Sequence, residues 1–149
     1  MPPESDLIKL YSGKILKMAA EPIYRERLSE PDASVTKRSP LCGSAITVDL
    51  NVESGVITHY GQEVRACALG QASSTIIGKA IVGRSLTEVQ RAYEELSDML
   101  KNEGPTPGKP FEELYMLKPA SEYKNRHASI LLALEATLAA FQQIEENDS

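Results

Sequence analysis

The chain has 149 residues, a length that suits one folded domain. Its composition, with 42% apolar and 25% charged residues, argues against disorder. Its net charge of −5 argues against nucleic-acid binding, which favours clustered Lys and Arg. No apolar run is long enough for a membrane span, and residues 1–14 lack the apolar stretch of a secretory signal, so we expect a cytoplasmic protein.

The N-terminal part of the chain predicts one helix followed by a strand. Apolar residues recur at helical spacing over residues 5–20, and Pro22 ends this helix. Residues 29–40 read as a loop that leads into a short strand. Over residues 44–52, apolar positions alternate with Thr, Asp and Asn, which predicts a strand with one buried face.

A second strand is predicted to pair antiparallel with this one. The turn at residues 53–55 is short enough for a hairpin. The second strand is expected over residues 56–60, to be interrupted at Gly61, and to resume at 64–66 after a bulge.

Helices are predicted for the rest of the chain. Residues 67–81 form a helix that ends at Gly83, and Ser85 with Glu88 makes a capping box that opens the next helix. The segments that follow are a Gly/Pro-rich loop at 104–110, a short helix at 111–117, a polar connection at 120–126 and a long helix from 127 to about 144.

The predicted fold class is α+β, with a small antiparallel sheet of about three strands packed against several helices. We expect a single domain over residues 1–149, with frayed ends at about 1–5 and 145–149.

Both cysteines and one histidine are candidate site residues. Cys42 lies in a loop just before a strand, and Cys67 lies at a strand-to-helix junction where free backbone N–H groups favour a thiolate. His127 begins the last helix beside Arg126, and a helix N-terminus favours the neutral imidazole that binds metals. The plain alternatives are buried cysteines that pack as small apolar residues and a surface or capping histidine. His59 lies in the hairpin, faces solvent and is given no role.

Two thiols and one imidazole suit zinc, iron or a sulfur intermediate. They also suit a nucleophilic Cys–His pair. The three residues are far apart along the chain, so their spacing does not choose between these chemistries.

Four motifs resemble those of the IscU/NifU family of iron–sulfur cluster assembly scaffolds. They follow in the family's order within residues 7–143. The first is Pro-Leu-Cys-Gly at 40–43, and the second is Arg-Ala-Cys-Ala-Leu-Gly-Gln-Ala-Ser-Ser at 65–74. The third is Gly-Arg-Ser-Leu-Thr-Glu at 83–88, and the fourth is Arg-His-Ala-Ser-Ile-Leu at 126–131.

The resemblance implies a carrier and not an enzyme. Such scaffolds receive sulfur from a cysteine desulfurase, combine it with iron and electrons into a [2Fe-2S] or [4Fe-4S] cluster, and pass the cluster to acceptor proteins. Many also bind zinc. The resemblance places the metal ligands at Cys42, Cys67 and His127. Three neighbouring residues are expected to surround these ligands: Ser44, Arg126 and Ser129.

The sequence departs from the family pattern at three places. The family's third cysteine falls at Ala128, and the Asp that follows its first Cys-Gly falls at Ser44. The stretch recognised by a chaperone falls at residues 121–125, Ser-Glu-Tyr-Lys-Asn, and does not match.

Because four ligands usually hold a [2Fe-2S] cluster, two thiolates and one imidazole leave it short of a ligand. A second chain in a homodimer, a partner's thiol, glutathione or an oxygen ligand would complete the set. Alternatively, the three residues hold one zinc or iron ion with an open position, in an accessory protein that interacts with the assembly machinery without building clusters. An enzyme with a Cys–His pair ranks lowest.

Overall fold

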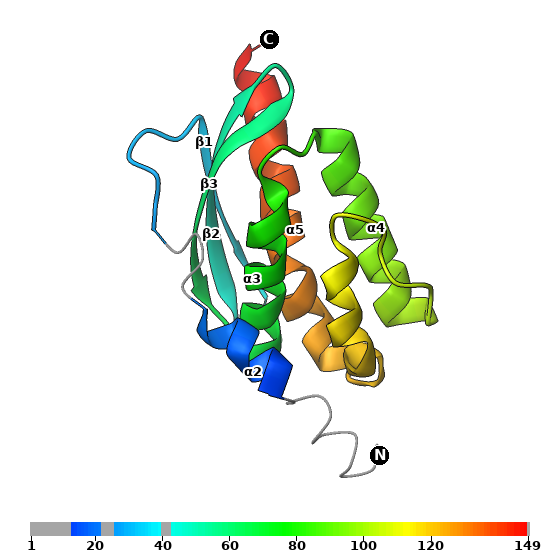
Figure 1. Ribbon diagram of the computed structural model, residues 1–149. Coiled ribbons are helices and arrows are strands. Elements are labelled where there is room, and N and C mark those ends of the chain that lie inside the picture. Colours follow the sequence, from blue (N-terminus) through cyan, green and yellow to red (C-terminus); the bar gives the residue numbers. More distant parts are fainter. Residues whose placement is uncertain (1–12, 22–25, 40–42, 149) are drawn as a thin grey trace.

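The computed structural model describes residues 13–21, 26–39 and 43–148 (Figure 1). A three-stranded antiparallel sheet in the order β1-β2-β3 forms one layer. Helices α3 and α5 cover one of its faces, and helix α4 and the 3₁₀ helix η1 pack beyond them (Figure 1). The predicted α+β class is confirmed.

The sheet consists of β1 (Ala33–Arg38), β2 (Ala45–Glu53) and β3 (Val56–Arg65). The predicted hairpin is confirmed, because only two residues with positive φ, Ser54 at 53° and Gly55 at 78°, separate β2 from β3. Turns with two positive φ angles match the twist of paired strands. The alternation in β2 places three buried side chains toward the helices: Ile46, Val48 and Leu50.

The predicted interruption at Gly61 is wrong. Strand β3 runs without a break, and the irregular pairing lies instead between Asn51 and Val52 of β2. Gly61 allows another backbone segment to approach the strand closely. A Cβ atom there would lie 2.5 Å from the carbonyl oxygen of Glu26 and 3.1 Å from the nitrogen of Leu28. A glycine in a strand marks such contacts as well as bulges.

Helix α2 (Gly13–Ala20) packs on α3 (Ala68–Ile81), while the rest of the predicted first helix lies outside the described residues. The predicted capping box at the start of α4 (Leu86–Asn102) is confirmed. The Ser85 hydroxyl accepts a hydrogen bond from Glu88 N at 3.3 Å, and Ser85 N donates to Glu88 Oε1 at 3.2 Å.

The predicted polar connection at 120–126 is wrong, and the short helix is longer than expected. The 3₁₀ helix η1 spans Glu112–Glu122, and α5 begins directly afterwards and spans Lys124–Asp148. A 3₁₀ helix has three residues per turn, and the buried residues of η1 follow this period at Leu114, Leu117 and Ala120. Helix α5 contacts β1, β2, α3, α4 and η1, so it forms the centre of the fold. None of the helices in the described part combines the length and apolarity needed to cross a membrane.

Candidate functional site

Cys67 occupies the junction predicted for it, as the N-cap residue of α3 with extended backbone angles of φ −65° and ψ 170°. Its side chain is half-buried and makes no capping hydrogen bond. The sulfur therefore occupies the N-cap position of α3 without accepting a hydrogen bond from the first-turn N–H groups.

A buried serine, Ser129, contacts the Cys67 sulfur and a second buried serine, Ser44. Ser129 Oγ, from α5, lies 3.7 Å from Cys67 Sγ and 2.9 Å from Ser44 Oγ, which precedes β2. Both serines are 2% exposed. Ser129 thus connects three segments that are remote in sequence, and the two serines expected around the ligands are brought together.

Cys42 lies outside the described residues, but the residues that flank its loop are held together. Ser39 N donates to the carbonyl oxygen of Ser44 at 2.8 Å, and Gly43 N donates to that of Ser39 at 3.2 Å. Gly43 has a φ of 70°, a conformation that favours glycine. The described residues on either side of positions 40–42, Ser39 and Gly43, are therefore held close to Ser44, the partner of Ser129.

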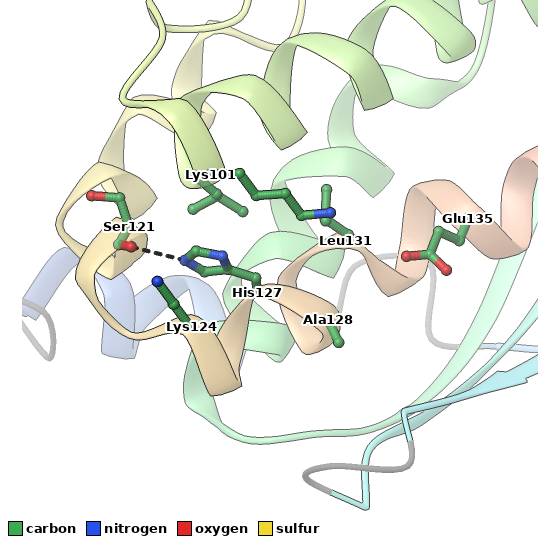
Figure 2. Close-up of a pocket in the computed structure, with 8 residues that line it drawn as sticks. Lys101, Ser121, Lys124, His127, Ala128, Leu131 and Glu135 are labelled. Carbon is green, nitrogen blue, oxygen red and sulfur yellow. Dashed lines mark hydrogen bonds between the residues drawn. The ribbon is translucent and has the colours of Figure 1, made fainter.

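His127 is buried, with 6% of its surface exposed, in the first turns of α5. Its Nε2 lies 3.1 Å from the carbonyl oxygen of Ala120 and 3.0 Å from that of Ser121 (Figure 2). Because both partners are acceptors, Nε2 must carry the proton and donate it. In the neutral ring Nδ1 then holds the lone pair, and it has no hydrogen-bond partner among the described residues. Nδ1 is therefore the atom available to a metal.

A pocket of about 480 Å³ opens beside His127 (Figure 2). It lies between the end of α4, the end of η1 and the first half of α5. Burial raises the pKa of its Glu135 carboxyl, and the ammonium groups of Lys37 and Lys101 oppose that shift only in part. The lining residues are Leu100, Lys101, Ser121, Lys124, His127, Ala128, Leu131 and Glu135.

The described residues show two neighbouring features and no completed metal centre. One is Cys67 with its serines and the other is His127 with its pocket, and no hydrogen bond joins Cys67 to His127. Among residues 13–21, 26–39 and 43–148, which do not include Cys42, no group of three His, Cys, Asp or Glu residues is placed to bind a metal ion. Arg126 is half-buried, and its backbone N–H donates to Tyr123 at 2.8 Å.

The pocket was not evident in the sequence. Lys101 and Glu135 lie on different helices at positions typical of solvated faces, and only the packing of α4 on α5 brings them together. Lys124 falls in the segment predicted as a polar connection. The one available signal was Ala128, which lines the pocket at the position where the family motif has cysteine.

The chain matches the family model for the NifU-like N-terminal domain over residues 10–142. It is 27% identical over 135 residues to the iron–sulfur cluster assembly scaffold protein IscU of Thermotoga maritima, covering 91% of this chain and 94% of that relative. The crystal structure of a nitrogen-fixing NifU-like protein (N-terminal) from Brucella abortus has a TM-score of 0.92 at 40% identity, covering 95% of this chain and 98% of that one. A scaffold candidate for the SUF system of Fervidobacterium islandicum AW-1 shares the fold, with a TM-score of 0.79 at 17% identity over 89% and 97% of the two chains.

Proposed function

The chain belongs to the NifU-like N-terminal domain family, and on this premise we propose that it is an iron–sulfur cluster assembly scaffold that holds its cargo at Cys42, Cys67 and His127. Iron, sulfide and the cluster are its cargo, not resident cofactors. A cysteine desulfurase would donate sulfur to the thiolate of Cys42 or Cys67, an electron donor would reduce that sulfur to sulfide, and an acceptor protein would receive the finished cluster.

The observation that carries the proposal is the pair of contacts that Ser129 makes, one with the Cys67 sulfur and one with Ser44. Ser129 links Cys67 to Ser44 through contacts of 3.7 Å and 2.9 Å. Cys42 precedes Ser44 by two residues in the sequence, so the proposal includes it in the same site.

His127 suits the third ligand position. Its Nε2–H donates to two backbone carbonyl oxygens, which orients the ring and leaves the Nδ1 lone pair available. Hydrogen bonding of the second ring nitrogen is the usual way in which proteins orient a metal-binding histidine. Two thiolates and one imidazole fit iron or zinc, and they leave one position of a tetrahedral ion open.

Anaerobic reconstitution with ferrous iron and sulfide tests the proposal. We expect visible charge-transfer absorption with matching iron and sulfide contents, and its loss in Cys67→Ala and in Cys42→Ala. His127→Ala should weaken retention of the cluster, whereas His59→Ala is the matched control because His59 is exposed in β3. A colourless product, or absorption that both cysteine variants retain, would contradict the proposal.

The second candidate function is a mononuclear zinc or iron accessory protein. The donor set favours it, because three protein ligands with an open position describe a single-ion site. Metal analysis of protein purified without oxygen separates the two functions. Stoichiometric zinc that persists after reconstitution, with no sulfide bound, would favour the accessory protein.

A further inference from the structure

We propose that the pocket beside His127 and Ala128 binds a small thiol that carries carboxylate and amino groups, and that the sulfur of this thiol supplies the ligand that the chain lacks. The inference rests on the proposed scaffold function and deepens it, because it names the source of the missing ligand. It also assigns a binding role to Lys101, Lys124 and Glu135, which the scaffold proposal leaves unused.

Two positive charges border the pocket. Lys101 comes from the last turn of α4, and Lys124 comes from the first turn of α5. Both side chains are exposed, and neither forms an ion pair with a carboxylate in the described part of the chain. In Figure 2 both lysines lie around the His127 ring. Two ammonium groups at one opening attract a ligand with carboxylates.

A single carboxylate lies at the other end of the same pocket. Glu135 is half-buried, and the Lys101 side chain extends between it and the His127 ring (Figure 2). A carboxylate accepts hydrogen bonds from an ammonium group. The pocket therefore offers partners for both signs of charge, which an amino-acid or short-peptide thiol carries and a neutral thiol lacks.

The position of Ala128 indicates where the sulfur would lie. Ala128 lines the pocket next to His127, and its side chain is a single methyl group. A thiol in the pocket can approach this methyl group and thereby come close to the imidazole. The pocket volume of about 480 Å³ is within the range of sites that bind small molecules, about 300 to 1,000 Å³. On binding iron, the thiol releases its proton to solvent and forms one iron–sulfur bond, so no oxidant or reductant is consumed.

The first test measures binding to the metal-free protein. Its probe is S-methylglutathione, which keeps two carboxylates and an amino group but cannot bind metal through a thiolate. We expect calorimetry to detect binding, and Lys101→Gln or Lys124→Gln to weaken it about tenfold each, the loss of one charge-assisted hydrogen bond. Lys118→Gln is the matched control, since Lys118 is exposed on η1 outside the pocket. Absence of binding, or equal weakening by all three variants, would overturn the inference.

The second test measures the cluster. We expect reconstitution with glutathione to retain more cluster than reconstitution with 2-mercaptoethanol, and Lys101→Gln to reduce this advantage. Ala128→Cys should retain cluster without added thiol. If the wild-type protein retains cluster equally with either thiol, the inference fails and the scaffold function stands. If neither the wild-type protein nor Ala128→Cys takes up cluster, the scaffold function itself fails.

Discussion

Asp49 shows how a single buried charge is accommodated in this fold. Its side chain is 0% exposed, although the alternation of β2 predicts a polar residue on the open face of the sheet. Arg27 Nε donates to its carboxylate at 2.7 Å, Leu28 N at 3.0 Å and Ser34 Oγ at 2.6 Å. Burial raises the pKa of Asp49, but the hydrogen bonds from Arg27, Ser34 and Leu28 outweigh burial, so the net pKa lies below its usual value.

The stability of the protein should therefore depend on Asp49 in acid. A carboxyl whose pKa is lower in the folded state contributes stability above the unfolded pKa, about 4, and this contribution is lost as the pH falls through the folded value. Asp49→Asn should remove this dependence and lower the unfolding free energy at neutral pH by about 1–3 kcal/mol, because the donors lose a charged acceptor. Urea unfolding between about pH 3 and about pH 7 measures both effects.

Ser34→Ala is the graded control for this prediction. It removes one donor at 2.6 Å and leaves the carboxylate and Arg27 in place. The acid dependence should become weaker without disappearing. If the unfolding free energy changed equally steeply with pH in the wild-type protein and in Asp49→Asn, other carboxyl groups would determine the acid stability.

At the scale of elements, the contact of α3 with α5 connects the packing of the fold to the Cys67 site. Gly70 of α3 faces Ser129, and a Cβ atom at Gly70 would overlap Ser129 Oγ and lie 2.8 Å from Ala66 Cβ. Nearby, Ser73 Oγ donates to the carbonyl oxygen of Ile130 at 2.6 Å. The absence of a side chain at Gly70 thus lets α5 place the Ser129 hydroxyl beside Cys67.

A double-mutant cycle tests this coupling. Gly70→Ala should destabilise the protein by about 1–3 kcal/mol through overpacking, despite the gain in helix propensity. Ser129→Ala should also destabilise it, by about 1–2 kcal/mol, since the buried Ser44 hydroxyl loses a partner. Because Ser129→Ala removes the atom that a Cβ at Gly70 would overlap, the double variant should lose less stability than the sum of the two.

The free energy of unfolding of every variant is measured by urea unfolding. Two further variants serve as controls for the cycle. Gly13→Ala adds a Cβ that meets no atom within 4 Å, so it should be neutral or stabilising. Ser73→Ala removes a different hydroxyl between α3 and α5, and it should add to Gly70→Ala without coupling. Strict additivity of Gly70→Ala with Ser129→Ala would refute the proposed contact.

The elements that the sequence predicted correctly carry their own local signals. The turn at Ser54 and Gly55 and the capping box of Ser85 with Glu88 are set by neighbouring residues. The errors lie where contact with a segment remote in sequence determines the local structure. At Gly61, for example, the backbone of residues 26–28 approaches the strand. The start of α5 was missed because the three-residue period of η1 becomes visible only once its buried face is known.

At the candidate site, too, the local features could be predicted from the sequence, whereas the contacts between remote segments could not. The junction position of Cys67 followed from its place between a strand and a helix, and the family motifs indicated His127 and Ala128. The burial of His127 and the hydrogen bonds of its Nε2 depend on the end of η1, which the sequence did not predict. Likewise, the approach of Ser129 to Ser44 joins residues 85 positions apart, and no local pattern reports such a contact.

For the whole molecule, the hydrophobic core does not depend on the candidate ligands. Buried apolar side chains from the sheet, α3, α4, η1 and α5 form one continuous cluster, whereas Cys67 lies half-buried at its margin. Small metal-binding domains that lack such a core unfold when the metal is removed. This chain should instead fold without cargo, as the proposed function requires.

Chelation of the metal should therefore leave the fold intact. We expect the metal-free protein to keep its far-ultraviolet circular dichroism and to unfold in one cooperative transition. Its unfolding free energy should fall only by the amount that ligand binding adds, about 2.7 kcal/mol at a hundredfold excess over the dissociation constant. Leu134→Ala, at a fully buried position of α5, is the contrasting variant and should cost about 2–5 kcal/mol with or without metal. A metal-free protein without a cooperative transition would mean that the cargo site supports the fold, because the core alone would then be insufficient for folding.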